Sequence, residues 1–357
     1  MKLVTFSVNT PFGEVVRLGA LRKDGYIVDL STANELRLTE LYGQYEGLRI
    51  AAKFPGDMLA FIRDGQRARD SAEEAMHFAR NMGTEPVGGL NAVFDSASVR
   101  ILSPLPRPSS IRCFSLSETH MLNSIASMQD TASWGIGKPA IAELAPEWYN
   151  LPAHYKNVVS EIYGPDDVVP WPALTDKFDY ELEVAVVIGG CGRHIAAGDA
   201  QKYIYGYTPY NDWSARDFQQ REMSINLGPA LCKDNASSLG PCIVTADEYD
   251  PIGKAFSIKV NGHLIAETKL DLYHSLSSII EYTASVQTLF PGDIFTTGTL
   301  PNGCGGERKQ WLAQGDIVEF QGEGIGTLRN IVGAKGADQQ LPASQRTLSQ
   351  IRRTCSM

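Results

Sequence analysis

The chain has 357 residues, of which 43% are hydrophobic and 20% charged, and its 41 acidic and 32 basic residues give a formal net charge of −9. A chain of this length and apolar content can bury a substantial core, and we expect about two domains. Because an acidic surface repels phosphate backbones and anionic headgroups, nucleic acid and membrane surfaces are not expected partners. The expected ligand is a small molecule.

Neither a membrane span nor a secretory signal is expected. The longest apolar runs, such as Val184 to Ile188, are much shorter than the roughly 18 residues that a spanning helix needs. The apolar stretch that ends before Asn9 is too short for a secretory signal. The six cysteines lie far apart without a C-x-x-C pair, which is typical of reduced, packed thiols. The sequence therefore predicts a cytoplasmic protein.

Residues 1–105 are predicted to form a small mixed α/β domain. Three strand-like runs separated by turns lie between Leu3 and Leu30. From Ala33 to Met82 the apolar residues recur at spacings of three and four, which predicts two or three helices that cover the sheet. The proline-rich segment that follows is typical of a linker.

The second predicted domain, residues 106–335, is β-rich. After one strand and a short helix, a long segment rich in Trp, Pro, Tyr and Gly has no clear period, and we expect residues 114–167 to form a lid. Apolar, β-branched runs follow from Glu183 onward, and helical patterns are few, which disfavours a doubly wound parallel sheet. Residues 336–357, rich in Gln, Ser and Arg, are expected to be a disordered tail.

A pair of carboxylates marks the start of an apolar strand. Glu181 and Glu183 are two residues apart, so in a strand both point to the same face, roughly 6.5–7 Å apart along the backbone. On pattern alone such a pair is an ordinary solvent-facing edge, unless a third group joins it. Asp212, which follows another predicted strand, is the candidate. Three carboxylates without His or Cys suit Mg²⁺, with Mn²⁺ or Ca²⁺ as alternatives.

Four motifs resemble the fumarylacetoacetate hydrolase (FAH) family in order and spacing. They are the E-x-E pair, the stretch N-D-W-S-A-R-D-x-Q from Asn211, the run Leu227-Gly228-Pro229 with the later Lys233, and Pro291-Gly292-Asp293-Ile294 with Thr297-Gly298-Thr299. The resemblance covers roughly Ile111 to Gly333. It implies an α+β, β-rich fold with a mixed, rolled β-sheet, a divalent metal bound by Glu181, Glu183 and Asp212, and usually a homodimer.

The resemblance also implies substrates with two nearby carbonyl groups. A 1,3-dicarbonyl or 2-oxo acid chelates the metal, which stabilises the enolate that forms when a carbon-carbon bond breaks or a proton leaves. Hydrolysis in addition needs a base that activates water, and His120 lies where the family has its catalytic His. Without that resemblance, a lone His is more often structural.

Four further side chains are expected at the site. Arg216 and Gln219, one helical turn apart, and Lys233 would stabilise a developing oxyanion or bind a substrate carboxylate. Thr299 would orient the substrate through its hydroxyl and N–H groups. The alternative is structural: Arg216 would pair with Asp217 or another acid, and Thr299 would end a hairpin.

Two positions depart from the family pattern. Cys113 stands where some members have an additional Asp ligand, and because a thiol is a poor ligand for a hard cation, a three-carboxylate site follows. Family hydrolases also pair the catalytic His with a Glu, but the corresponding positions are Asn123 and Ile317. Either Glu118 or another acid replaces that Glu, or the reaction needs no activated water. A nucleophilic pair of Cys113 and His120 is a minor alternative.

These observations predict a Mg²⁺-dependent hydrolase that cleaves a carbon-carbon bond in an acylpyruvate-like or other 1,3-diketone substrate. An isomerase, decarboxylase or dehydratase that acts on a 2-oxo acid at the same metal site is the first alternative, and the missing His–Glu pair favours it. A metal-binding protein that binds a small acid without turnover is the second.

Overall fold

The computed structural model describes residues 1–129, 143–226 and 228–336. Residues 130–142 of the predicted lid, Leu227 and all of the predicted tail except Gly336 lie outside these ranges. In the described part of the chain, no helix is long and apolar enough to cross a membrane.

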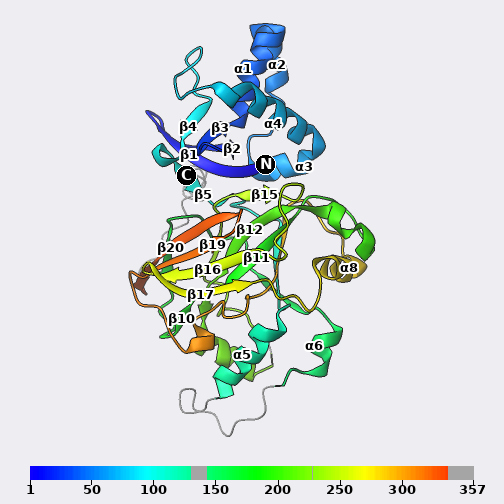
Figure 1. Ribbon diagram of the computed structural model, residues 1–357, viewed down its shortest axis with the longest axis vertical. Helices are drawn as coiled ribbons and strands as arrows, with labels where there is room; N and C mark the ends of the chain where they lie inside the picture. Colours follow the sequence, from blue (N-terminus) through cyan, green and yellow to red (C-terminus); the bar gives the residue numbers. More distant parts are fainter. Residues whose placement is uncertain (130–142, 227, 337–357) are drawn as a thin grey trace, which may run out of the picture.

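The amino-terminal region combines an antiparallel sheet with helices that lie at one end of the molecule (Figure 1). Its elements are β1 (Lys2–Thr10), β2 (Gly13–Leu21), β3 (Tyr26–Asp29), α1 (Leu30–Tyr42), α2 (Gln44–Ala51), α3 (Met58–Asp64), α4 (Gln66–Phe78), η1 (Ala79–Asn81), β4 (Val93–Asp95), η2 (Ser96–Ser98) and β5 (Arg100–Leu102). Asp29 and Asp57 accept hydrogen bonds at the starts of α1 and α3, as helix N-caps do. The four helices are more than the two or three that the apolar period predicts.

A large mixed sheet forms the centre of the molecule, and β1 connects the amino-terminal strands to it through β15. The strand order is β4-β3-β2-β1-β15-β12-β11-β18-β6-β7, with β5, β8 and β14 paired beside this path. The strands of this sheet that follow β5 in the chain are β6 (Ser110–Phe114), β7 (His154–Asn157), β8 (Ile162–Tyr163), β11 (Leu182–Ile188), β12 (Ile204–Asp212), β14 (Ser237–Leu239), β15 (Ile243–Thr245) and β18 (Asp293–Thr296). β7 and β8 belong to this sheet although they lie within the predicted lid segment.

A five-stranded sheet covers one face of the large sheet (Figure 1). Its strands are β17 (His263–Lys269), β16 (Ala255–Val260), β19 (Ile317–Gly322), β20 (Gly326–Lys335) and β9 (Val168–Trp171). Val184 and Val186 of β11 share a core with Phe256 and Phe320 of this sheet. Ala185 of β11 instead belongs to the core shared with the amino-terminal helices. Since both faces of β11 are buried, its continuous apolar run is explained.

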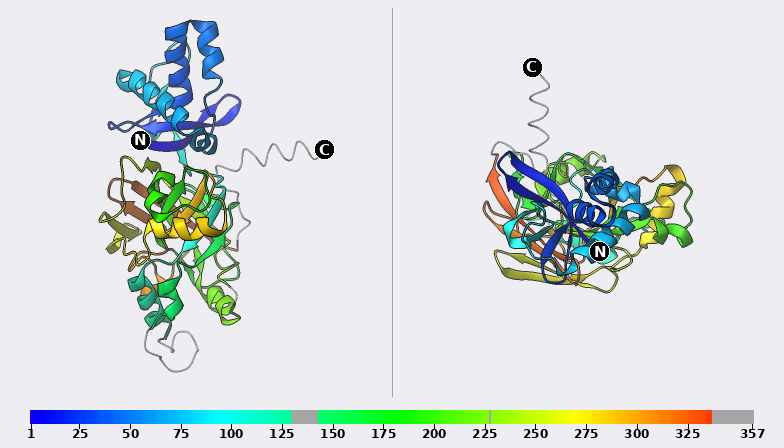
Figure 2. Two further views of the ribbon diagram at one scale, coloured as in Figure 1. Left: turned by 90° about the vertical axis from the view of Figure 1, so that its right-hand side faces the viewer. Right: turned by 90° about the horizontal axis from the view of Figure 1, so that it is seen from above.

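The remaining elements flank the two sheets (Figure 1). They are α5 (Glu118–Gln129), α6 (Pro146–Asn150), β10 (Phe178–Asp179), η3 (Ala197–Tyr203), β13 (Ser214–Ala215), α7 (Arg216–Ser224), α8 (Leu276–Val286) and η4 (Gly306–Arg308). Figure 2 shows α5 and α6 at the end opposite the amino-terminal helices. The predicted α+β, β-rich fold is confirmed.

Candidate metal centre

Three carboxylates meet where β11 and β12 pair. Glu183 lies opposite Tyr210 in the antiparallel register, Asp212 ends β12, and Glu181 precedes β11, so all three side chains share one face of the sheet. Glu181, Glu183 and Asp212 are buried, and one oxygen from each lies within 4.8 Å of the others. The structure thus brings together the three residues that the sequence predicts as metal ligands.

Two buried cations lie against this carboxylate cluster. Lys233 Nζ is 2.6 Å from Glu181 Oε2 and 3.3 Å from Asp212 Oδ2. Arg216 Nη1 is 2.7 Å from Glu181 Oε1, and its Nε is 2.7 Å from Asp179 Oδ2. With Asp179 included, the four carboxylates would, when all are ionised, exceed the two cations by two negative charges, the charge that one divalent cation neutralises. Uncompensated charge in a buried site is costly, so this excess favours cation binding.

Glu183 is the one member of the cluster that forms no ion pair with the described residues. Its Oε2 is buried and accepts no hydrogen bond from the described residues. Burial, together with the negative charges of Asp212 and Glu181, raises the pKa of Glu183 well above its ordinary value. Burial would also raise the pKa of Glu181, but Lys233 and Arg216 outweigh it and lower that pKa to about 2. The orphaned oxygen and the all-oxygen donor set fit a hard divalent cation such as Mg²⁺.

Asp212 is held in place from β7. Tyr155 donates its hydroxyl hydrogen to Asp212 Oδ2, and Asn157 Nδ2 donates to Oδ1 at 3.0 Å. Cys113 lies nearby, with its Sγ 3.8 Å from the Tyr210 hydroxyl. Burial, with the charges of Asp212 and Glu183, raises the pKa of the Cys113 thiol well above its ordinary value. A protonated thiol is a poor nucleophile, so the minor alternative of a Cys113–His120 pair has no support here.

His120 has a carboxylate partner that the sequence does not reveal. Its Nδ1 lies 2.7 Å from Glu307 Oε1, and Asn123 Nδ2 donates to Glu307 Oε2 at 2.8 Å. Burial raises the pKa of Glu307, but the hydrogen bonds from His120 and Asn123 outweigh it and the pKa is lowered. Glu307 is therefore an ionised acceptor that fixes the orientation of the imidazole ring.

The positions that the sequence suggested as partners of His120 do not supply its carboxylate. Glu118 accepts a hydrogen bond from the Tyr149 hydroxyl at 2.6 Å, and Ile317 begins β19. Asn123 has no carboxylate of its own to offer His120, and its Nδ2 instead donates to Glu307. Glu307 stands in η4 within a stretch without periodicity, and no motif marks it in the sequence.

The predicted substrate-binding residues lie beside the carboxylates. The alternative ion pair between Arg216 and Asp217 does not form. Arg216 Nη1 donates to Gln219 Oε1 at 3.0 Å, and Arg216 Nη2 is buried without a hydrogen-bond partner among the described residues. Asp217 does not pair with Arg216; it accepts hydrogen bonds from the Thr175 hydroxyl and the Asp176 N–H. Thr299 is buried, and the next residue bonds through its N–H to the carbonyl of Leu182 at 3.0 Å.

The family model that describes the C-terminal domain of fumarylacetoacetate hydrolase matches residues 122–333, more than half of the chain. The chain belongs to the FAH family. It is 28% identical over 346 residues to the fumarylacetoacetate hydrolase domain-containing protein 2 homolog of Dictyostelium discoideum, which covers 93% of this chain and 97% of that protein. It is 37% identical over 186 residues to the mitochondrial oxaloacetate tautomerase Fahd2a of Rattus norvegicus, a match that covers 51% of this chain and 58% of that protein.

Solved structures show the same fold. The maleylpyruvate hydrolase of Sphingobium sp. SYK-6, in complex with manganese(II) and pyruvate, aligns with a TM-score of 0.62 at 24% identity, over 94% of this chain and 100% of that chain. At this identity the likeness establishes the fold of this FAH-family chain.

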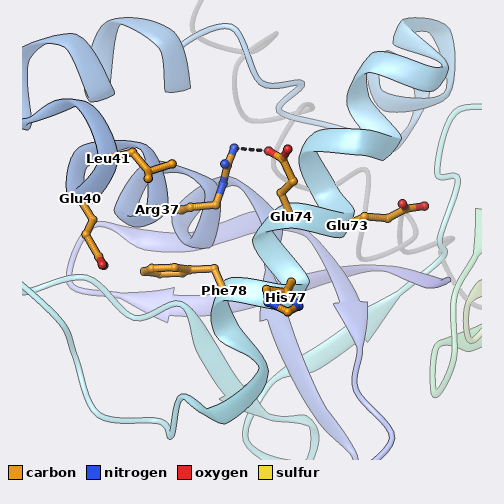
Figure 3. A pocket seen from close by; sticks show the side chains of 7 residues that line it. All are labelled: Arg37, Glu40, Leu41, Glu73, Glu74, His77 and Phe78. Carbon is orange, nitrogen blue, oxygen red and sulfur yellow. Dashed lines mark ion pairs between the residues drawn. The ribbon is translucent and has the colours of Figure 1, made fainter.

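A groove in the amino-terminal region of this FAH-family chain lies far from the carboxylates. It encloses about 450 Å³ between α1 and α4, and its lining includes the Arg37–Glu74 ion pair, at 2.8 Å, and His77 (Figure 3). Its acidic side chains are partly exposed and its basic group already has an acidic partner. The groove therefore offers no comparable cation site.

Proposed function

We propose that this FAH-family chain is a Mg²⁺-dependent hydrolase that cleaves a carbon-carbon bond in an acylpyruvate-like or other 1,3-diketone substrate. The observation that carries the proposal is the His120–Glu307 pair beside the three-carboxylate cluster. The pair lies near the cluster because Cys304, which forms a β-bridge with Glu181, has its Sγ 3.8 Å from Glu307 Oε1. A base with an orienting carboxylate, next to a candidate cation site, is what hydrolysis requires.

The residues that would hold the cation are Glu181, Glu183 and Asp212. When bound there, a divalent cation would polarise the two oxygens of a chelated substrate and take up negative charge as an enolate forms. Mg²⁺ is the cation that the all-oxygen donor set favours, and the manganese(II) in the related maleylpyruvate hydrolase supports Mn²⁺ as an alternative.

The chain's own residues supply the proton transfers and the binding of substrate. His120, oriented by Glu307, takes a proton from water as the water oxygen bonds to the acyl carbon. The bond between that carbon and its neighbour breaks, its electrons move to the departing enolate, and His120 returns the proton to the enolate carbon. The free Nη2 of Arg216 would bind the developing oxyanion or a substrate carboxylate, and Lys233 would stabilise the same negative charge through its own positive charge.

Gln219 and Thr299 would complete the binding of substrate. Gln219 accepts a hydrogen bond from Arg216, which leaves its amide N–H groups for a substrate oxygen. Thr299 is buried beside the start of β11 and would offer its hydroxyl group. A homodimer and a cytoplasmic location remain predictions from the resemblance and the sequence.

Tautomerisation of a 2-oxo acid such as oxaloacetate is the second candidate. The observation that favours it is the 37% identity to the rat oxaloacetate tautomerase over about half of each chain. Here His120 would move a proton between carbon and the enol oxygen, and no water would be consumed. The sequence favours an isomerase only because it shows no carboxylate beside His120. Glu307 supplies that carboxylate, so this reason no longer holds.

One experiment separates these activities. The full chain is incubated with Mg²⁺ or Mn²⁺ in ¹⁸O-water and offered acylpyruvates, β-diketones and oxaloacetate. Hydrolysis must place ¹⁸O in a new carboxylate, whereas tautomerisation changes the enol absorbance without cleavage. Glu183→Gln should be inactive, and Glu267→Gln, an exposed change on β17, should be fully active. Metal-independent turnover, or dicarboxylate binding without any product, would overturn the proposal.

A further inference from the structure

We propose that Cys304, His120 and Glu307 form a second metal site, selective for Zn²⁺, whose occupation inactivates the catalytic base. The three residues offer a nitrogen, a sulfur and an oxygen that all lie within 4.8 Å of one another. His120 Nδ1 is 2.7 Å and Cys304 Sγ is 3.8 Å from the same oxygen, Glu307 Oε1. Zinc binding itself is independent of the proposed function, and only its inhibitory effect rests on it.

The donor set distinguishes this site from the carboxylate cluster. Imidazole, thiolate and carboxylate are the usual ligands of Zn²⁺, which binds sulfur at about 2.3 Å and nitrogen at about 2.0–2.1 Å. In a tetrahedral site, ligand atoms at such bond lengths are separated by roughly 3.4–3.7 Å. The separations of 2.7 Å and 3.8 Å lie below and above that range, so small side-chain movements would complete the site. A sulfur ligand is unfavourable for Mg²⁺, which should stay with the oxygens.

The residues are held close together by contacts outside the site. Cys304 forms an isolated β-bridge with Glu181, and its carbonyl accepts a hydrogen bond from Arg308 Nη1 at 2.9 Å. Ser127, on the same helix as His120, donates to the carbonyl of Gly306 at 2.6 Å. The loop that carries Cys304 and Glu307 is therefore attached both to the carboxylate cluster and to α5. Three protein ligands completed by a water molecule are one of the usual arrangements around Zn²⁺.

Zinc at this position would remove the base without removing Mg²⁺. When Nδ1 is coordinated, the neutral imidazole ring carries its proton on Nε2, so neither nitrogen keeps a lone pair to accept a proton, and coordination of Glu307 replaces its hydrogen bond to His120. Inhibition should therefore persist at saturating Mg²⁺. If Zn²⁺ instead displaced Mg²⁺ from Glu181, Glu183 and Asp212, excess Mg²⁺ would relieve it.

Cobalt(II) spectroscopy tests the site without a substrate. The full chain carries Cys191→Ser and Cys355→Ser, which remove the exposed thiol and the one outside the described residues. With Mg²⁺ in excess, added Co²⁺ should produce a thiolate-to-cobalt charge-transfer band. The further change Cys304→Ser should abolish the band. Cys242→Ser, which alters a buried thiol that contacts the Ile325 carbonyl, should keep it.

The carboxylate cluster serves as the second control. Glu183→Gln should leave the cobalt band in place, because Glu183 is not a ligand of this site. A band that survives Cys304→Ser, or the absence of any band in the parent protein, would overturn the proposal. Cys304→Ala, with circular dichroism to confirm its fold, guards against a result that comes from misfolding.

Zinc inhibition of turnover gives the functional measure. At saturating Mg²⁺, each protein's rate is compared with its own zinc-free rate. Cys304→Ser should raise the zinc concentration for half inhibition by at least roughly 10-fold, because even the loss of a contact to a ligand costs about 10- to 100-fold in metal affinity. Inhibition that Cys304→Ser leaves unchanged would refute the site. If no diketone or oxo acid is turned over, the proposed function fails while the cobalt band still decides whether the zinc site exists.

Discussion

Replacing Glu183 with Gln should abolish the response of the protein to Mg²⁺ without weakening the metal-free fold. Gln has nearly the same shape as Glu but no charge. The buried Oε2 of Glu183 has no hydrogen-bond partner among the described residues, and the carboxylates of Asp212 and Glu181 raise its pKa together with burial. Removing this charge relieves repulsion in the metal-free protein and at the same time removes a ligand.

The expected size of the effect follows from linkage between binding and folding. A ligand at 100 times its Kd stabilises the native state by about 2.7 kcal/mol. For domains of this size, each kcal/mol shifts the Tm by roughly 2–4 °C, so saturating Mg²⁺ should raise the Tm of the unchanged protein by roughly 5–10 °C. In Glu183→Gln at the same Mg²⁺ concentration this rise should be absent.

The stability of the metal-free protein should also change with pH, and the raised pKa of Glu183 gives the direction of that change. A carboxyl whose folded-state pKa is raised stabilises the fold fully below its ordinary pKa of 4.5, and this contribution is lost as the pH rises through the folded-state pKa. Metal-free protein should therefore lose stability on this account above pH 4.5, and Glu183→Gln should lose less.

Thermal unfolding followed by circular dichroism, with and without Mg²⁺, measures both effects. The control is Glu267→Gln, which removes an exposed carboxylate on β17 and should keep the full metal-induced rise. A Glu183→Gln protein that still gains several degrees on adding Mg²⁺ would refute the ligand assignment. A metal-free variant far less stable than the parent would refute the argument from repulsion.

Three further changes test the catalytic base, the buried cation and the core. Glu307→Gln should lower kcat by about 10²–10⁴-fold and leave the Mg²⁺-induced rise in Tm intact; steady-state rates that stay near normal would contradict the role of the pair. Lys233→Met leaves Glu181 without its cation at 2.6 Å, so urea unfolding of metal-free protein should show a loss of about 3–5 kcal/mol; a loss below about 1 kcal/mol would contradict a buried ion pair. Phe178→Ala removes a buried ring stacked 5.3 Å from Trp213 and should lower the free energy of unfolding by about 3–5 kcal/mol in the same assay. A far smaller loss, as expected for an exposed side chain, would contradict its place in the core.

The cluster of Glu181, Glu183 and Asp212 could be predicted because its geometry is local. Two acids two residues apart at the start of a strand share a face whatever the rest of the fold does. The strand itself is marked by β-branched residues bounded by glycine, and the predicted run from Glu183 to Ile188 differs from β11 by one residue. Asp212 needed one further step, the pairing of two successive strands, which adjacent segments commonly make.

The His120–Glu307 pair could not be predicted because it forms only in the tertiary structure. His120 and Glu307 are separated by 187 residues, and no local pattern indicates which distant acid a helix will face. Tyr155, which bonds to Asp212, lies in a segment with no strand period although it forms β7. The exposed β17 also escaped prediction, because it packs few side chains into a core and its alternation is weak.

Asp179 explains why these local and tertiary parts act as one site. Its carboxylate accepts hydrogen bonds from the N–H groups of Gly305 and Gly306 at 2.8 and 2.9 Å and from Arg216 Nε at 2.7 Å. The glycines begin the turn that carries Glu307, and Arg216 contacts Glu181, so one buried acid joins the base to the carboxylate cluster. A Cβ on Gly305 would lie 2.5 Å from Asp179 Oδ1, which explains why glycine stands there. The distance between His120–Glu307 and the carboxylate cluster is therefore held by buried hydrogen bonds and ion pairs, as catalysis by a positioned base requires.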